Sequence, residues 1–431
     1  MFKSLASAFK DKDIRKKLII VLLLLVVYRL GCWLPVPGLN ADTYSSIVEN
    51  DSVGILSLLN TVTGSALSNA AFFALGVTPY INASIIVQLL TFGIPALQRL
   101  SKQGDEGREK INLITKIVAI VLAIAQGVGI VLGYQNTLSP IFGEKLVWLT
   151  GVMVVVLLVA GTCMTMWLGD RITAQGIGNG LSLIIFVGII ATSAQSIANA
   201  ISSVFTSNIS YLWELLGFIA MAIILFALIV WVDGAERRIP VQYAKQVKGR
   251  KMFGGQSSYI PMKVNATGVM PIIFATAIIT FPSLLIALFW QNTGFANWWG
   301  TYMGTGTIVY SICVALLILF FSYFYAQMQF NPAEVSLNIQ QNGGFIPGIR
   351  PGKPTTDYLS RVSKRITLFG AIFLAFLALV PAIIFKIVAG GQLSLLNAFT
   401  ATGMLIIVSV ALEFSQQLDA QLMMKRHKNL L

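Results

Sequence analysis

Few residues of this sequence have the type and spacing that catalysis or ion coordination requires. The single histidine, His427, lies in the C-terminal tail, so neither a histidine-based triad nor a zinc-binding helix can be assembled. The segment PGKPT at 351–355 resembles the end of a phosphate-binding loop, but Pro354 follows Lys353 where serine or threonine should stand. We therefore expect a protein that is not an enzyme and that needs no metal or cofactor.

The ionisable and thiol groups of the apolar segments likewise lack the pattern that ion coordination requires. Transporters coupled to protons or sodium normally carry carboxylates or histidines inside their spans. Here the centres of the apolar segments hold none, and Glu214 and Glu413 fall near segment ends. Whatever crosses is therefore driven by another molecule. Three cysteines stand alone without the spacing for a disulfide or a metal site, and we interpret them as small apolar side chains: Cys32, Cys163 and Cys313.

Aliphatic side chains are the more informative feature of the segment 74–92, ALGVTPYINASIIVQLLTF. Ile81 and Ile85 stand one helical turn apart on one face, with β-branched side chains that are stiff at χ1. Polar residues such as Asn82 and Gln88 would be unfavourable facing lipid, so this helix should face protein or water on one side. The preceding segment, 52–70, is too polar to span and is expected to fold back towards Ile81.

Composition places these segments in a membrane. Hydrophobic residues make up 56% of the chain and charged residues 11%, with a mean hydropathy of +0.78, against about 45–50% and 25% in soluble domains. We predict an all-α polytopic membrane protein. The N-terminal basic residues and apolar run imitate a secretion signal, but Asp11, Asp13 and Arg29 argue against that interpretation.

Windows of about 20 apolar residues, the length that crosses a bilayer as a helix, predict ten spans: 18–34, 74–92, 113–134, 146–168, 178–200, 212–232, 268–290, 307–325, 366–388 and 393–412. With the N-terminus inside, 27 of the 30 basic residues fall on the cytoplasmic side, and Arg29, Lys145 and Lys386 fall towards the outside. This asymmetry supports ten spans and explains most of the net charge of +13 without a nucleic-acid partner.

Ten spans divide into two halves of five, and because five is odd the second half starts from the opposite side of the membrane, as an inverted repeat requires. This expectation depends on parity alone, since the sequence has no visible residue-level repeat. We predict a cytoplasmic segment 1–17, an N-terminal half 18–200, a C-terminal half 201–412 and a cytoplasmic tail 413–431. Two long inner loops, 233–265 and 331–365, are basic and rich in Gly, Pro and Gln. Loops of this length are usually functional or disordered, although the inner loops of membrane proteins are commonly basic without a special function. The spacing of Gly and Pro around Arg350 predicts a shaped turn that presents this cation.

Along nearly its whole length the sequence resembles the SecY family, the channel subunits of the bacterial protein translocon. Six segments carry the resemblance in the family's order: FALGVTPYINASIIVQLL at 73–90, SKQGDEGREK at 101–110, GIGNGLSLIIF at 176–186, ERRIPVQYAKQ at 236–246, IPMKVNATGVMPIIFA at 260–275 and NPAEVSLNIQQNGGFIPGIRPGKPT at 331–355. The resemblance implies an hourglass pore between two five-span halves. A ring of aliphatic side chains would narrow the pore: Ile81, Ile85, Ile185, Ile189, Ile273 and Ile406. Without the resemblance, packing of spans against one another would be the simpler explanation for these isoleucines.

The resemblance also implies moving parts. Segment 52–70 would be a plug that closes the outer funnel, with Leu58, Leu59, Asn60, Thr61 and Gly64 among its residues. The family often has a glycine pair here, whereas Ser65 follows Gly64. Spans two, three, seven and eight would form a lateral gate to lipid, with Gln88, Thr276 and Thr280 as polar contacts or, equally, as donors to their own helices.

Finally, the resemblance implies partners. The inner loops would dock the motor ATPase SecA and the ribosome through Arg237, Arg238, Lys245, Lys248, Arg250, Lys251 and Arg350. Many family members carry an acidic residue at the position of Lys353. Small membrane subunits of the SecE and SecG types, an unfolded precursor as substrate, and the bacterial plasma membrane complete the expectation. The alternatives are a ten-span secondary transporter with an inverted repeat and, third, a membrane scaffold.

Overall fold

The structure is a computed structural model of the 431-residue chain. It describes residues 9–49, 60–101, 103–133, 138–139, 147–176, 178–206, 210–243, 246–248, 251–253, 257–265, 268, 270–289, 293–304, 307–388 and 401–428. Helices dominate these ranges, as the composition predicted. Two compact units can be separated, one of residues 1–215, 277–310 and 389–431 and one of residues 216–276 and 311–388. The predicted halves, 18–200 and 201–412, stay a prediction.

A helix occupies most of each expected span. These helices are α2 (Lys12–Gly31), α5 (Thr78–Gly93), α7 (Asp105–Gly133), α8 (Val147–Ala174), α9 (Gly180–Thr206), α10 (Ser210–Asp233), α11 (Met270–Phe289), α13 (Ile308–Gln329), α15 (Lys353–Val388) and α17 (Ala401–Lys428). By length and composition, five helices within the described ranges could cross a membrane. A sixth candidate is the pair formed by α5 and α6 (Pro95–Ser101), which are bent by 104° at the break before Pro95. The number of spans stays a prediction.

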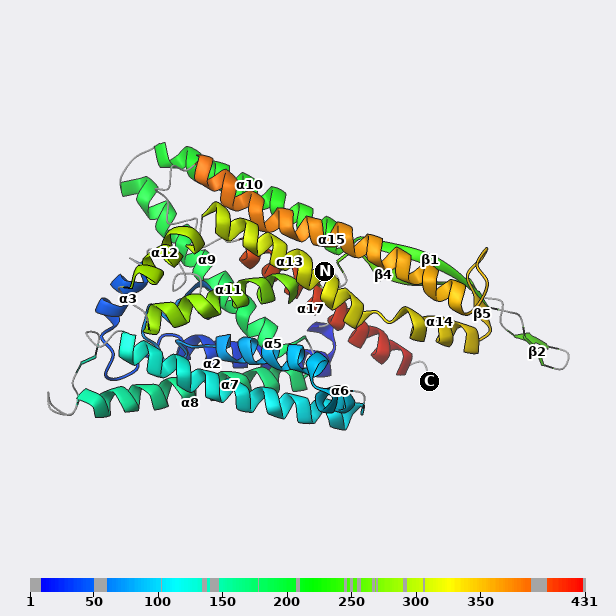
Figure 1. Ribbon diagram of the computed structural model, residues 1–431, viewed down its shortest axis with the longest axis horizontal. Helices are drawn as coiled ribbons and strands as arrows, with labels where there is room; N and C mark the ends of the chain where they lie inside the picture. The colour runs from blue at the N-terminus through cyan, green and yellow to red at the C-terminus, as the bar shows by residue number, and fades with distance from the viewer. Residues whose placement is uncertain are drawn as a thin grey trace. The chain divides into compact units, whose positions relative to one another are not determined.

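The first unit is a bundle of helices from both ends of the chain. Helix α5 packs on α7, α7 on α8 and α8 on α9, while α17 packs on α9, and α2 contacts both α8 and α9 (Figure 1). Close packing depends on glycine at one point, because a Cβ on Gly161 of α8 would lie 2.0 Å from the carbonyl oxygen of Phe72. Lys116 of α7 and Asp170 of α8 form an ion pair at 2.5 Å. Two short helices, α3 (Ala41–Glu49) and α12 (Gly294–Met303), also belong to this unit.

The second unit contains the only sheet of three strands in the described chain. Strands β1 (Glu236–Tyr243) and β4 (Ser257–Lys263) pair antiparallel with Ile239 opposite Ile260, and β5 (Gly344–Phe345) pairs with the end of β1. Strands β2 (Gln246–Lys248) and β3 (Lys251–Phe253) form a separate hairpin. The two long loops that were predicted to be cytoplasmic, 233–265 and 331–365, are therefore joined by strand pairing.

A small core holds the sheet against helices. Ile239 and Val241 are buried and alternate with exposed residues along β1, as expected for a strand with one covered face. They pack with Met262 of β4 and with three residues of the second loop, Ile339, Ile346 and Leu359. Ile339 belongs to α14 (Pro332–Gln341) and Leu359 to the first turns of α15, which lie side by side in Figure 1. The sheet and these helices form one core, which we call the cytoplasmic-loop core because its two loops are predicted to be cytoplasmic.

Candidate functional site

The described part of the plug segment begins at Asn60, and Leu58 and Leu59 lie outside the described residues. The C-terminal turn of α2 holds it by two hydrogen bonds to its backbone. The guanidinium Nη1 of Arg29 donates to the carbonyl oxygen of Gly64 at 2.8 Å, and the hydroxyl of Tyr28 donates to that of Thr63 at 3.3 Å. The sequence analysis used Arg29 against a secretion signal and counted it among three cations towards the outside, so its hydrogen bond to Gly64 was not predicted.

The middle of α9 holds the segment from its other side. The hydroxyl of Thr192 donates to the carbonyl oxygen of Thr61 at 3.3 Å. One turn earlier, Gly188 lets the two backbones meet, because a Cβ there would lie 2.7 Å from the carbonyl oxygen of Val62. A Cβ atom does not approach a carbonyl oxygen so closely in real proteins, so only glycine fits at this position. The plug segment thus docks between α2 and α9, within the first unit.

Two consecutive residues of the plug segment, Gly64 and Ser65, have an unusual backbone conformation. Both residues adopt the left-handed region, with φ of 73° and 66°. Glycine does so at no steric cost, whereas another L-residue loses roughly 1–2 kcal/mol. The cost of this conformation at Ser65 is offset by a hydrogen bond from its backbone N–H to the carbonyl oxygen of Asn60, at 2.9 Å. Ser65 therefore adopts the left-handed conformation that glycine adopts at no steric cost.

The six isoleucines of the expected ring lie on four helices. Ile81 and Ile85 are on α5, Ile185 and Ile189 on α9, Ile273 on α11 and Ile406 on α17. Ile81 and Ile273 are half-buried and the other four are buried. Helices α9 and α17 pack together, and the backbone N–H of Gly178 before α9 donates to the Gln417 side chain of α17 at 2.5 Å. Ile189 adjoins Gly188, so it lies where α9 meets the plug segment. The ring itself stays a prediction.

The polar candidates for the lateral gate bond within their own helices. Gln88 donates from Nε2 to the hydroxyl of Ser84 at 3.1 Å, and Thr276 donates to the carbonyl oxygens of Ile272 and Ile273, both at 3.0 Å. The side chain of Thr280 lies outside the described residues. Gln88 and Thr276 thus bond within their own helices, which was one of the two arrangements expected for them. The lateral gate stays a prediction.

Two of the predicted docking cations lie on β1 and are exposed. Arg238 binds Glu236 through an Nε–Oε1 contact of 2.6 Å, and its guanidinium lies 4.9 Å from the centre of the Tyr259 ring. The hydrogen bond to Glu236 raises the pKa of Arg238, so this cation stays charged but is partly neutralised by its neighbour. Arg237 lies beside it with an exposed side chain. Lys245 and Arg250 lie outside the described residues, as do the side chains of Lys248 and Lys251.

Arg350 stands on a turn that the chain fixes at several points. Gly348 and Gly352, on either side of it, adopt φ of 82° and 92°, which glycine alone adopts freely. The hydroxyl of Thr355 donates to the carbonyl oxygen of Arg350 at 2.9 Å, and that of Ser336 on α14 donates to the carbonyl oxygen of Gly352 at 3.0 Å. These bonds agree with the predicted shaped turn.

The charge on this turn is available to a partner. The Arg350 side chain is exposed, and within the part of the chain that the structure describes no carboxylate lies within ion-pair distance of it. Arg238, by contrast, already has Glu236. Of the predicted docking cations whose side chains are described, Arg237 and Arg350 have no carboxylate within ion-pair distance, and Arg350 stands on a turn that side-chain hydrogen bonds hold in place.

Comparison with known proteins identifies the family. The family model of SecY matches residues 71–415. A protein translocase subunit SecY of Streptomyces galbus is 41% identical over the whole of both chains. The fold is similar to that of a solved SecY channel, whose plug domain is described as stabilising the closed state and maintaining a membrane seal, with a TM-score of 0.64 and 21% identity over 92% of this chain and 90% of the other. It is also similar to Sec61 in a canine ribosome–channel complex, with a TM-score of 0.61 and 19% identity over 92% and 90% of the chains.

Proposed function

The chain belongs to the SecY family, and from that premise we propose that it works as the central protein-conducting channel of a Sec translocase. It passes unfolded secretory proteins across the bacterial plasma membrane and releases transmembrane segments sideways into lipid. It is a channel subunit rather than an enzyme, and both termini lie in the cytoplasm. The transporter alternative is disfavoured because the apolar cores of the spans hold no carboxylate or histidine to carry an ion.

The docking of the plug segment between α2 and α9 carries this proposal. Its contacts include two neutral hydrogen bonds, from Tyr28 and Thr192, and one charged hydrogen bond from Arg29. Such bonds contribute about 0.5–1.5 kcal/mol each when neutral and about 1.5–3 when charged. A signal helix that buries several hundred Å² gains about 25 cal/mol per Å², which is comparable in size. The plug segment thus stays docked in the closed channel without a substrate, and binding of a signal helix can displace it.

The isoleucine ring gives the channel its selectivity. A constriction of hydrocarbon side chains makes water and ions lose hydration, so it gates by dewetting. It offers no fixed donor or acceptor to hold a passing peptide, so chains of varied sequence can slide through.

Substituting one ring residue by a smaller polar one should loosen this seal. Ile189→Thr keeps a β-branched side chain but replaces the ethyl group with a hydroxyl, and we expect it to raise ion conductance several-fold in planar bilayers and to relax signal selection. The adjacent Ile190, 39% exposed on another face of α9, provides the matched control. Conductance of Ile189→Thr that equals that of Ile190→Thr would count against the ring.

A small membrane subunit of the SecE type is proposed to cover a groove on the first unit. The groove has a volume of about 350 Å³ and is lined by apolar side chains of α2, α9 and α17, among them Leu22, Phe186 and Phe414. A cysteine at Leu22 should crosslink to a cysteine in the helix of that subunit, whereas a cysteine at exposed Ile117 of α7 should not. Absence of the first crosslink would remove this assignment. A SecG-type subunit is expected to copurify.

SecA and the ribosome are proposed to dock on the cytoplasmic-loop core. Cations at Arg237, Arg238 and Arg350 suit both ribosomal RNA phosphates and acidic patches on a motor. Arg237→Glu is expected to weaken cosedimentation with ribosomes, increasingly so at low salt. If binding is unchanged at every salt concentration, this strand is not part of the ribosome contact.

A further inference from the structure

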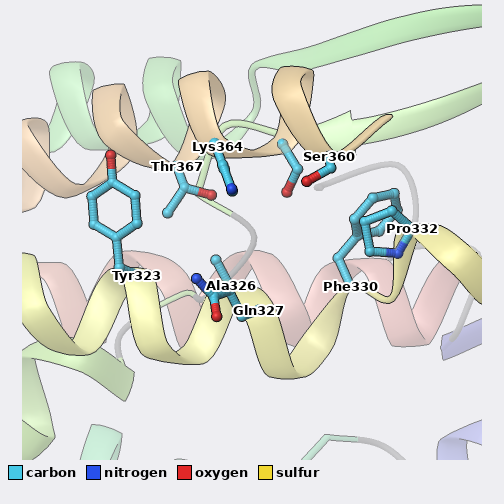
Figure 2. A pocket seen from close by; sticks show the side chains of 9 residues that line it. Tyr323, Ala326, Gln327, Phe330, Pro332, Ser360, Lys364 and Thr367 are labelled. Atoms are coloured by element: carbon cyan, nitrogen blue, oxygen red, sulfur yellow. The ribbon is translucent and has the colours of Figure 1, made fainter. Parts of the chain in front are cut away.

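A polar pocket lies in the second unit between the end of α13 and the start of α15. Its volume is about 330 Å³. Tyr323 and Gln327 reach it from α13, and Lys364 and Thr367 reach it from α15, so that the two sets of side chains converge between the helices (Figure 2). Ser360 and Ser363 add two hydroxyls from α15. None of the functions proposed above uses these groups.

The lining residues of each helix share one face. On α13 they are residues 323, 326 and 327, and Phe330 and Pro332 line the pocket beyond its end at Gln329. On α15 they are residues 360, 363, 364 and 367. The spacings i, i+3, i+4 on α13 and i, i+3, i+4, i+7 on α15 place side chains on one helical face. The pocket is therefore formed by a face of each helix, each contributing several side chains.

The chemistry of this lining selects an anion. It offers one ammonium group, four hydroxyls and one amide, all of which can donate hydrogen bonds. Among the described residues that line the pocket, none is aspartate or glutamate. Arg361 and Arg365, exposed on either side of Lys364 along α15, add to the positive potential. Phosphate oxygens accept hydrogen bonds from such donors and gain further from the charge.

The position of the pocket along the helices selects the source of the phosphate. The apolar span of α13 is predicted to end at Tyr325 and that of α15 to begin at Ile366, and both residues fall within the stretch that lines the pocket. Beyond it, towards the membrane centre, Phe320 and Phe369 expose 61% and 59% of their surface. A phospholipid has this same arrangement, with its phosphate at the interface and its acyl chains beside the apolar surface.

We propose that this pocket binds the phosphate headgroup of an anionic phospholipid from the cytoplasmic leaflet. The Lys364 ammonium pairs with the phosphate, hydroxyls of Ser360, Thr367 and Tyr323 donate to its oxygens, and the acyl chains run along Phe320 and Phe369. The negative potential of the cytoplasmic leaflet and its attraction for juxtamembrane basic residues favour this occupant. The bound headgroup links α13 to α15 directly beneath the cytoplasmic-loop core.

Lipid retention by the full chain tests the proposal. The protein is reconstituted in nanodiscs of phosphatidylcholine with a minor fraction of phosphatidylglycerol, and retained phosphatidylglycerol is counted by native mass spectrometry after release. Lys364→Gln should lower retention about tenfold, the size expected for loss of one charged hydrogen bond. Arg361→Gln removes the same charge from the same helix outside the pocket and should change retention little. Equal losses from the two variants would mean diffuse attraction and would overturn the site.

Two further arms separate the possible sources and roles. Thr367→Val removes a hydroxyl at nearly constant volume and should lower retention, while Thr367→Ser should restore it; identical retention by the two would exclude hydroxyl recognition. Inorganic phosphate added in excess should not displace the lipid, because it lacks acyl chains. Displacement would overturn the lipid assignment in favour of a free anion. Unchanged chymotryptic fragments in all variants, none of which adds or removes an aromatic residue, show that the fold is retained.

Discussion

Arg350→Glu is expected to abolish motor-driven translocation while the protein stays folded and inserted in the membrane. The turn that carries Arg350 is held by bonds to backbone atoms, from Thr355 and Ser336, and none of these uses the guanidinium. Because the side chain is exposed, reversing its charge removes no buried contact. Loss of a charge pair at an interface costs about 2–5 kcal/mol, so precursor import should fall by at least about 30-fold.

A second charge reversal nearby provides the control. Lys353 is also exposed and is the first residue of α15. At a helix N-terminus a negative side chain is favoured by the helix dipole, so Lys353→Glu should be tolerated structurally and should reduce import far less. The measurement is import of a secretory precursor into inverted vesicles containing each variant with its motor. Normal import by Arg350→Glu, or equal loss from both variants, would contradict a specific role for Arg350.

Gly188→Ala is expected to displace the plug segment and make the resting channel leak ions. The new Cβ would lie 2.7 Å from the carbonyl oxygen of Val62 and 3.3 Å from the N–H nitrogen of Gly64. Backbone atoms cannot give way as a flexible side chain can, so the segment must shift. Overpacking of this kind costs about 1–3 kcal/mol, which raises the population of the undocked plug by roughly 5-fold to 150-fold.

The control for this substitution is another helical glycine. Gly217 of α10 has no atom within 4 Å of the position that a Cβ would take, and Gly217→Ala gains the same helix propensity, about 1 kcal/mol. Single-channel recording in planar bilayers should show leak for Gly188→Ala alone. Arg29→Met, which removes the 2.8 Å bond to Gly64, should leak as well. A sealed channel in both Gly188→Ala and Arg29→Met would rule out docking of the plug segment on α2 and α9.

Much of the helical architecture could be predicted from the sequence, because the mean hydropathy of a window depends only on neighbouring residues. The ends of the helices could not be predicted in this way. The window for the ninth span begins at residue 366, but α15 begins at Lys353, since its first turns bury Leu359 on one side and expose polar residues on the other. Average hydropathy does not detect a helix whose apolar residues occupy only one face.

The sheet of the cytoplasmic-loop core was missed for a different reason. Strand β1 pairs with β5, about a hundred residues later, and the pairing of Gln242 with Phe345 leaves no local signal in either loop. Gly188 did carry a signal, since a glycine inside a helical apolar pattern often marks a close backbone approach. Its partner could not be identified, because contact with Val62 depends on how the re-entrant segment folds back.

Photocrosslinking of a stalled secretory chain tests the central idea, a constriction of aliphatic side chains through which a polypeptide passes. Photoreactive residues are placed at Ile81 and Ile406 and, as lipid-facing controls, at Ile117 and Ile223, which are 54% and 63% exposed. We predict strong crosslinks to the stalled chain from the first two positions and none above background from the controls. Crosslinks from neither Ile81 nor Ile406, with a chain demonstrably stalled in the translocase, would contradict this account.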